Sequence, residues 1–445
     1  MNTIRMTAAV AALGLTASLA GCTPPESGGG TPSASGGEPR SITYWASQQG
    51  PSIEFDEEVL TAALGRFTER TGIDVELEVI PWTDMYNRML AAISSGEGPD
   101  VMNAGNTWSV SLQETGALLP FEGDALEGIG GTDRFLPANM GSTGAPGVAP
   151  TSLPLYGFAY SLYYNTAIFE AAGITEAPKT WQELVDIAHR LTADTDGDGK
   201  TDQWGVALAG NRIPANAHAA FMYGLWHGGQ LYDADGNPTF DDPGVVQGVK
   251  MWIDLMADGV VDPANSEYNT VGQIQDDLVA GRAAMIIDQN PHAAFASREF
   301  DGWGIAPIPV IDPLKPGGEA IRTHVSGINI SIFKNTDDLD ASLQLVKALT
   351  DDEQVHLNSS YGLLPVTEAA FGDPAFEADY IQLKREILAT SSKPMPLVNT
   401  EGQMETLVGT AIGQLFATIA SGGTVTEDDV RAALADANAQ IIAQA

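Results

Sequence analysis

Hydrophobic and polar residues alternate along this chain with two different periods. Residues 75–79 read VELEV, which has the two-residue period of a half-buried strand, and residues 42–45 form another short β-rich run. Between them, the apolar residues of 57–71 recur at helical spacing, and Gly72 follows as a stop signal. The chain after residue 41 is therefore predicted to begin as strand, helix, strand.

The same alternation continues to the C-terminus. We expect further strands at 99–103, 283–288, 304–311 and 327–333. We expect further helices at 84–93, 181–191, 245–257, 340–350, 379–389, 404–420 and 426–444. Strands that alternate with helices predict α/β sheets built from crossover units, and the number of elements predicts two α/β lobes. In such sheets ligands bind beyond the carboxyl ends of the strands.

Composition narrows the class of protein further. The 445 residues contain 58 acidic and 21 basic side chains, a formal net charge of -37. This excess of acid argues against a nucleic-acid partner, because binding phosphates requires a basic face. The 44% of hydrophobic residues is enough for a packed core, so the chain is not predicted to be disordered throughout.

The N-terminal residues are typical of an export signal. Arg5 precedes an apolar, Ala-rich stretch, and the tetrapeptide Leu-Ala-Gly-Cys ends at Cys22, the only cysteine of the chain. This tetrapeptide resembles the lipobox of bacterial lipoproteins. We therefore expect a signal peptide at 1–21, lipidation of Cys22, and a flexible Pro/Gly/Ser-rich linker over 22–40. The alternative is an ordinary signal peptide with an incidental cysteine.

A run of aspartates at 194–202 has the spacing of a calcium-binding loop. Side chains at the first, third, fifth and ninth positions and a backbone carbonyl at the seventh surround one cation in such loops. The candidate ligands are Asp194, Asp196, Asp198, Asp202 and the carbonyl of Lys200. Gly205 stands where a bidentate glutamate usually completes the site, so the alternative is a solvated acidic turn. We expect any calcium to be structural, and no cofactor to be required.

Several local sequences, taken in order, resemble the extracellular solute-binding proteins of ABC importers, specifically the maltose-binding or family 1 class. These are the segments 96–101, 115–120, 163–165, 169–174, 178–184, 280–285 and 362–365. The resemblance implies a two-lobed, periplasmic-binding-protein-like α/β fold of class II type. Each lobe is then a mixed sheet flanked by helices, with a cleft and a hinge between them. On that pattern, lobe 1 takes 41–150 plus 326–373, and lobe 2 takes 151–325 plus 374–445.

The resemblance also implies a binding function, in which the solute is not chemically changed. The protein is expected to capture a mono- or oligosaccharide in the cleft and to deliver it to a membrane permease. It would act as a monomer, anchored by lipid to the extracytoplasmic face of the cell membrane. Alternatives are a binder of another small solute, such as a glycerol phosphodiester or a polyamine, and an extracellular glycosidase. The chain contains no Gly-x-Ser-x-Gly elbow and no His-Glu-x-x-His zinc motif, so we do not expect an enzyme.

Candidate ligand contacts follow from the chemistry of sugars. Flat aromatic rings suit their C–H faces, and the side chains of Asn, Gln, Asp and Arg can each satisfy two of their hydroxyls. On loops after predicted strands, or where the family presents cleft contacts, the candidates are Trp45, Gln48, Gln49, Asn106, Thr107, Trp108, Phe158, Asn211, Asp288, Asn290, His292, His324, Ser326 and Glu401. Core positions are expected for Trp181, Trp204, Trp252 and Trp303, and a structural role for Trp82 at a helix start.

Overall fold

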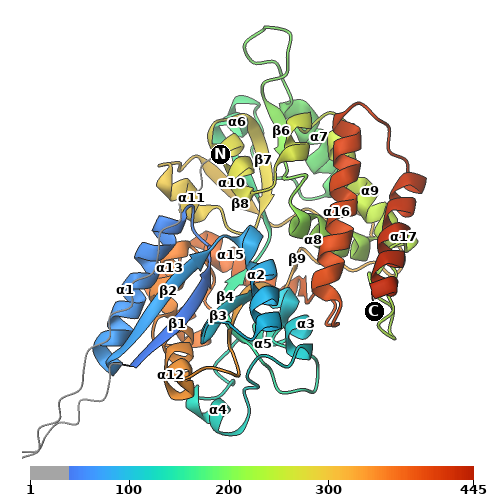
Figure 1. Ribbon diagram of the computed structural model, residues 1–445. Helices are drawn as coiled ribbons and strands as arrows, with labels where there is room; N and C mark the ends of the chain where they lie inside the picture. Colours follow the sequence, from blue (N-terminus) through green and yellow to red (C-terminus); the bar gives the residue numbers. More distant parts are fainter. Residues whose placement is uncertain (1–39, 445) are drawn as a thin grey trace, which may run out of the picture. The chain divides into compact units, whose positions relative to one another are not determined.

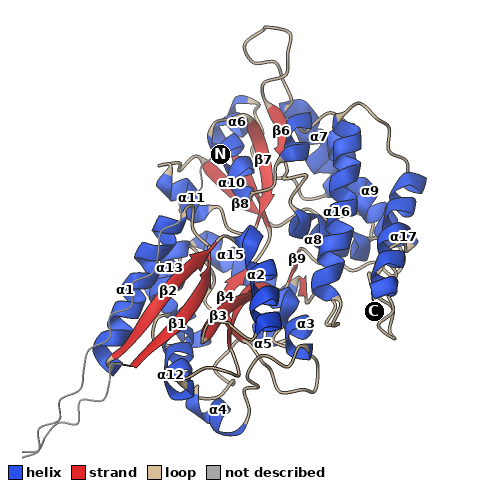
Figure 2. Ribbon diagram, viewed as in Figure 1, coloured by secondary structure: helices blue, strands red, loops and turns tan. Residues whose placement is uncertain are grey.

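The computed structural model describes residues 40–444, and these contain two separate β-sheets flanked by helices (Figures 1 and 2). The predicted two-lobed α/β fold is confirmed. The predicted signal peptide and the lipidated Cys22 lie outside the described residues. No helix between residues 40 and 444 is both long enough and apolar enough to cross a membrane.

The first sheet has five strands in the order β2-β1-β3-β10-β4. Its strands are β1 (Arg40–Ser47), β2 (Ile73–Ile80), β3 (Val101–Gly105), β4 (Leu153–Phe158) and β10 (Ser326–Ile332). β1 pairs in parallel with β2 and β3, whereas β10 is antiparallel to both β3 and β4. β4 belongs to this sheet, so the first sheet extends beyond the boundary predicted at residue 150.

The second sheet has four strands in the order β6-β7-β5-β8. Its strands are β5 (Ser161–Asn165), β6 (Trp204–Ala207), β7 (Ala283–Asp288) and β8 (Trp303–Ala306). β8 ends at Ala306, whereas the apolar pattern predicted a strand to residue 311. β5 follows β4 after two residues, so the chain passes from one sheet to the other at Ala159 and Tyr160.

Three segments that pass between the lobes are hydrogen-bonded to one another. The amide of Tyr160 donates to the Thr323 hydroxyl at 3.0 Å. The two-residue strands β9 (Thr323–His324) and β11 (Ser392–Lys393) pair in parallel. These crossings are where the predicted hinge falls.

Both faces of each sheet are covered by apolar packing. The neighbouring residues Val101 and Met102 of β3 belong to different buried clusters, as expected when successive side chains of a strand point to opposite faces. In the second sheet, Leu162 and Tyr163 of β5 belong to different buried clusters in the same way.

The helices that cover the sheets and complete the lobes are α1 (Ile53–Thr71), α2 (Trp82–Ser95), α3 (Ser109–Glu114), α4 (Gly123–Gly128), α5 (Pro137–Met140), α6 (Thr166–Ala171), α7 (Trp181–Leu191), α8 (Ile213–Trp226), α9 (Pro243–Ala257), α10 (Val271–Val279), α11 (His292–Ser297), α12 (Leu339–Thr350), α13 (Gln354–Tyr361), α14 (Glu368–Phe371), α15 (Asp379–Thr390), α16 (Glu401–Ala420) and α17 (Glu427–Gln444).

The predicted helix signals agree with the observed ends. Gly72 ends α1 in the left-handed conformation, and the Thr180 hydroxyl accepts from the amide of Glu183 at the start of α7. α1 begins four residues earlier than expected because Ser52 caps it, with its hydroxyl accepting from the amide of Phe55.

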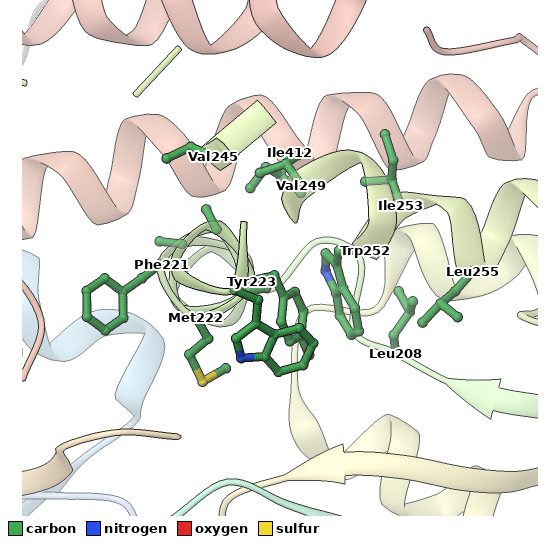
Figure 3. Close-up of a cluster of buried hydrophobic side chains, with 14 of the residues drawn as sticks. Leu208, Phe221, Met222, Tyr223, Val245, Val249, Trp252, Ile253, Leu255 and Ile412 are labelled. Carbon is green, nitrogen blue, oxygen red and sulfur yellow. The ribbon is translucent and has the colours of Figure 1, made fainter. Parts of the chain in front are cut away.

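The largest apolar cluster surrounds α8, which is buried on almost every side. Figure 3 shows Tyr223 of α8 beside Trp252 of α9, with Phe221 on the other side of α8 and Ile412 of α16 in the same cluster. Trp181 and Trp252 are core residues, as predicted. Because α8, α9 and α16 pack on one another, the first turn of α8 has a fixed position at the edge of the second lobe.

Candidate functional site

A cavity of about 810 Å³ lies between loops of the first sheet and the helices and strand ends of the second lobe. This volume is in the upper part of the range found for small-molecule sites. The first lobe contributes the loops after β1 and β3, the start of α2, and the beginning of β10. The second lobe contributes the starts of α8, α10 and α16 and the loop after β7. Strand ends therefore define the cavity, as expected for open α/β sheets.

One wall of the cavity is aromatic and comes from the first lobe. The rings of Trp82 and Trp108 stack at 4.8 Å with an angle of 15° between their planes. Tyr86 packs on Trp108 at 4.8 Å and 46°. Gly105 makes this arrangement possible, since a Cβ there would approach both indoles to 3.1 Å.

Trp108 is almost completely covered by protein. Trp82 covers one side, Tyr86 packs on it as well, and the residue is only 4% exposed. Trp82 is only partly buried, and it lines the cavity. Trp82, predicted to be structural, therefore provides the flat surface that was expected from Trp108.

A chain of hydrogen bonds crosses the cavity between the two lobes. The indole N–H of Trp108 donates to Glu405 Oε2 at 2.9 Å. The other carboxylate oxygen of Glu405 lies 3.0 Å from His218 Nε2, and His218 Nδ1 lies 3.0 Å from the Tyr160 hydroxyl. The chain links the aromatic wall to α16, α8 and the crossing segment, so it fixes the distance between the walls in this conformation.

The opposite wall presents amides and a carboxylate. Asp288 Oδ2 accepts from Gln275 Nε2 at 2.7 Å, and its Oδ1 accepts from the amide of Gln289 at 2.6 Å. Gln289 Nε2 donates to the Ser326 hydroxyl at 2.6 Å, and Asn290 Nδ2 donates to the carbonyl of Tyr361 at 2.8 Å. These bonds fix the positions of the polar groups on this wall.

Two side chains near the crossing segments, Tyr160 and His324, have shifted pKa values. Burial raises the pKa of Tyr160 to about 12, although the positive charge of Arg212 opposes the shift. Burial holds the pKa of His324 well below its usual value, and His218 and Arg212 act in the same direction. His324 is therefore neutral at physiological pH, and its Nδ1 has no hydrogen-bond partner among the described residues.

The cavity brings together eleven of the fourteen predicted contact residues. They are Gln48, Gln49, Asn106, Thr107, Trp108, Phe158, Asn211, Asp288, Asn290, His324 and Ser326. Some of these side chains are already engaged by protein. For example, Asn106 Nδ2 donates to the Ser142 hydroxyl at 2.9 Å and to the carbonyl of Val325 at 2.8 Å.

Three predicted contacts do not line the cavity. Trp45 packs with the cluster under α2, with the guanidinium of Arg88 over its ring at 4.3 Å. His292 is buried and stacks on Tyr380 at 3.9 Å. Glu401 is fully buried, and burial beside Glu405 raises its pKa well above the usual value.

The structure adds cavity residues that the sequence patterns did not single out. Besides Trp82, these include Tyr86, His218, Gln275 and Glu405. His218 lies in an apolar helix and resembles a core residue in the pattern. Glu405 could have been predicted from its spacing, because it lies one helical turn after Glu401 on the same face of α16.

The acidic loop forms a compact turn away from the cavity. Carboxylate oxygens of Asp194, Asp196 and Asp202 lie within 4.8 Å of one another, and all three residues are exposed. Backbone amides of Gly197 and Gly199 donate to Asp194 at 2.7 Å. Three of the four predicted side-chain ligands therefore converge, and the group excludes Asp198.

Known proteins resemble this chain over most of its length. A binding protein of Brucella abortus (strain 2308) is 25% identical over 345 residues, which is 76% of this chain and 78% of its own. The maltotriose-binding protein of Pyrococcus abyssi (strain GE5 / Orsay) is 24% identical over 310 residues, 69% of this chain and 63% of its own. An ABC transporter solute-binding protein of Thermotoga lettingae TMO, solved with α-D-tagatose, has a TM-score of 0.77 at 22% identity, over 90% of this chain and 100% of its own.

The chain also matches a protein-family model over more than half of its length. Residues 50–356 match the bacterial extracellular solute-binding proteins, a segment that includes most of both sheets and most of the residues around the cavity. The segment ends before α16, which supplies Glu405. The chain belongs to the family of bacterial extracellular solute-binding proteins.

Proposed function

We propose that this protein captures a carbohydrate in the cavity and delivers it to the permease of an ABC importer. The observation that carries the proposal is the pairing of an aromatic wall at Trp82 with a wall of amides and a carboxylate around Asp288. A sugar has both kinds of surface, a weakly polar C–H face and a rim of hydroxyls. The names of the Pyrococcus and Thermotoga relatives, which refer to maltotriose and tagatose, support the same class of ligand.

The proposal is tested by binding. Thermal melts of the purified protein against mono-, di- and trisaccharides should show stabilisation by a small group of related sugars. At about 1,000 times its dissociation constant, such a ligand adds roughly 4 kcal/mol to the free energy of unfolding. Asp288→Ala should weaken the binding strongly, whereas Asp74→Ala, at an exposed position of β2, should not. Stabilisation by polyamines or glycerol phosphodiesters, with none by any sugar, would contradict the proposal.

Binding without chemical change is part of the proposal. Relatives in this family are binding proteins, and the two carboxylates on the cavity, Asp288 and Glu405, are both occupied by protein hydrogen bonds. The sugar should therefore be recovered intact after long incubation, as measured by mass spectrometry. Cleavage products that disappear in a Glu405→Gln variant would favour the glycosidase alternative.

Membership of an extracellular family places the protein outside the cytoplasm. We propose that a lipid on Cys22 anchors it there, as a monomer on the membrane surface. In cells expressing the full chain, labelled fatty acid should be incorporated into the wild type and not into Cys22→Ala. Release of an unlabelled wild-type protein into the medium would indicate an ordinary signal peptide.

We also propose that the loop Asp194–Asp202 binds calcium as a structural clip. Its three converging carboxylates are the kind of oxygen ligands that calcium prefers, and extracellular calcium is concentrated enough to fill weak sites. Millimolar calcium should raise the melting temperature of the wild type by a degree or more, and the shift should be lost in Asp194→Asn/Asp202→Asn. An equal calcium shift in wild type and double variant would place the ion elsewhere.

A further inference from the structure

Arg212 is a cation on the cavity that has no carboxylate partner. It precedes α8 and lines the cavity, and it forms no ion pair with any of residues 40–444. The chain has 58 acidic side chains for 21 basic ones, so acidic partners for an arginine are abundant, yet none within residues 40–444 pairs with Arg212. The other arginine on the cavity, Arg298, is paired with Asp276 at 2.5 Å.

The carboxylates on the cavity are already satisfied by other groups. Glu405 accepts from Trp108 and contacts His218 at 3.0 Å. Asp288 accepts from Gln275 and from the amide of Gln289, and the buried amine of Lys384 attracts it from behind the cavity wall. Neither carboxylate compensates Arg212 directly, so its charge is available to a ligand.

The surroundings of Arg212 reinforce this positive region. Arg212 is the N-cap residue of the 14-residue helix α8, and no side chain caps that end. A helix N-terminus carries partial positive charge and favours anions. His324 also lines the cavity, is 1% exposed, and has an Nδ1 without a hydrogen-bond partner among the described residues. The ring of His324 lies 4.0 Å from that of His218 and 5.7 Å from that of Tyr160, and His218 and His324 line the same cavity as Arg212.

We propose that the preferred ligand is a carbohydrate bearing an anionic group, a carboxylate or a phosphate, that pairs with Arg212. The inference rests on the proposed carbohydrate function and specifies its ligand class. The guanidinium matches the two oxygens of a carboxylate or phosphate in a bidentate pair. The neutral part of the same ligand would lie on Trp82.

Matched pairs of sugars test the proposal on the purified protein. Glucose is compared with glucuronate, galactose with galacturonate and galactobiose with digalacturonate, and glucose 6-phosphate and galactose 6-phosphate are measured beside them. In at least one pair the anionic member should bind about tenfold more tightly or better, measured by calorimetry. That preference should shrink as sodium chloride is raised. A phosphate ester that binds more tightly than the corresponding acid would identify the anion as phosphate.

Two variants separate charge from hydrogen bonding at Arg212. Arg212→Gln should lower the affinity for the anionic ligand to that for its neutral counterpart. Arg212→Lys should retain part of the preference for the anionic ligand. Lys334→Gln, which removes an equal charge from an exposed loop away from the cavity, should leave the preference intact. If Arg212→Gln fails to fold, the preference of the wild type and its salt dependence decide the question.

The outcomes distinguish this inference from the function on which it rests. Neutral sugars that bind as tightly as their acids or phosphates would overturn the anionic ligand and leave carbohydrate capture in place. In that case Arg212→Gln would weaken the binding of neutral and anionic ligands by the same factor. Failure of every sugar, neutral or anionic, to bind would overturn both.

Discussion

Trp82 is the residue whose exposed ring best fits the C–H face of a sugar. Trp108 stacks on the ring of Trp82 at 4.8 Å, and this contact fixes the orientation of Trp82. Trp82→Ala should therefore weaken binding of the identified carbohydrate by about tenfold, because a stacking contact of roughly 1 kcal/mol is lost together with buried apolar area. Isothermal titration calorimetry measures the change.

Trp45 provides the matched control for that variant. It was also expected to face the ligand, but it packs under Arg88 and lies outside the cavity. Trp45→Ala should cost stability and leave the dissociation constant nearly unchanged. The opposite pattern, with affinity lost at Trp45 and kept at Trp82, would show that the ligand lies on another surface.

The sequence pattern predicted the cavity residues that follow strands, but not those that lie within helices. The polar residues after β1, β3 and β7 were predicted as cavity residues because strand ends are visible in the pattern. His218 and Glu405 were not, because each lies within a helix, and only the packing of α8 against α16 brings them to 3.0 Å. His292 does not line the cavity for a related reason, since its ring stacks on Tyr380 at 3.9 Å.

At the scale of elements, α15 carries a buried amine into the region where the lobes meet. Lys384 is fully buried, and burial lowers its pKa to about 7, although Asp288 opposes the shift. Because the pKa in the folded state lies below that of the unfolded chain, Lys384 costs stability below about pH 7. The cost declines as the pH rises from 7 toward the unfolded pKa near 10.5.

Lys384→Met should therefore raise the free energy of unfolding by about 2–4 kcal/mol at pH 6, and by less at pH 9. Urea unfolding at the two pH values measures the difference. Lys347→Met is the control, since Lys347 is exposed near the C-terminal end of α12. A gain that is the same at both pH values would mean that packing, and not the charge of Lys384, is responsible.

Elements differed in how well the pattern predicted them. The long helices α1, α7, α9 and α16 and the strands β2, β7 and β10 were predicted because their apolar periods are strong. β4 was missed because it lies in a Gly- and Pro-rich region and is buried along its whole length, so it shows no alternation. Its place in the first sheet depends on β10, a strand formed by residues far along the chain.

At the scale of the whole molecule, the net charge of -37 opposes the compact state through self-repulsion. Among residues 40–444, only a minority of the carboxylates have an ion-pair partner, because basic residues are few. Raising sodium chloride from 10 to 500 mM should therefore increase the melting temperature by about 2–5 °C. Differential scanning calorimetry without ligand measures the shift.

The control for this salt effect is the same measurement at low pH. Near pH 4.5 many carboxylates become protonated, so the repulsion is weaker and the salt effect should shrink. Potassium chloride should act like sodium chloride, because screening depends on ionic strength. A salt effect that is unchanged at pH 4.5, or specific to one cation, would point to ion binding in place of screening.

The position of β10 between β3 and β4 has a consequence for the order in which the protein can be assembled. A chain that emerges from its N-terminus presents β1 to β4 early, but the strand that joins β3 to β4 becomes available only at residues 326–332. Until then two strand edges of the first sheet have no neighbour, whereas the second sheet has all its strands by residue 306. The sheet that is first in sequence is therefore the later one to be completed, and its unpaired strand edges are open to aggregation during that interval.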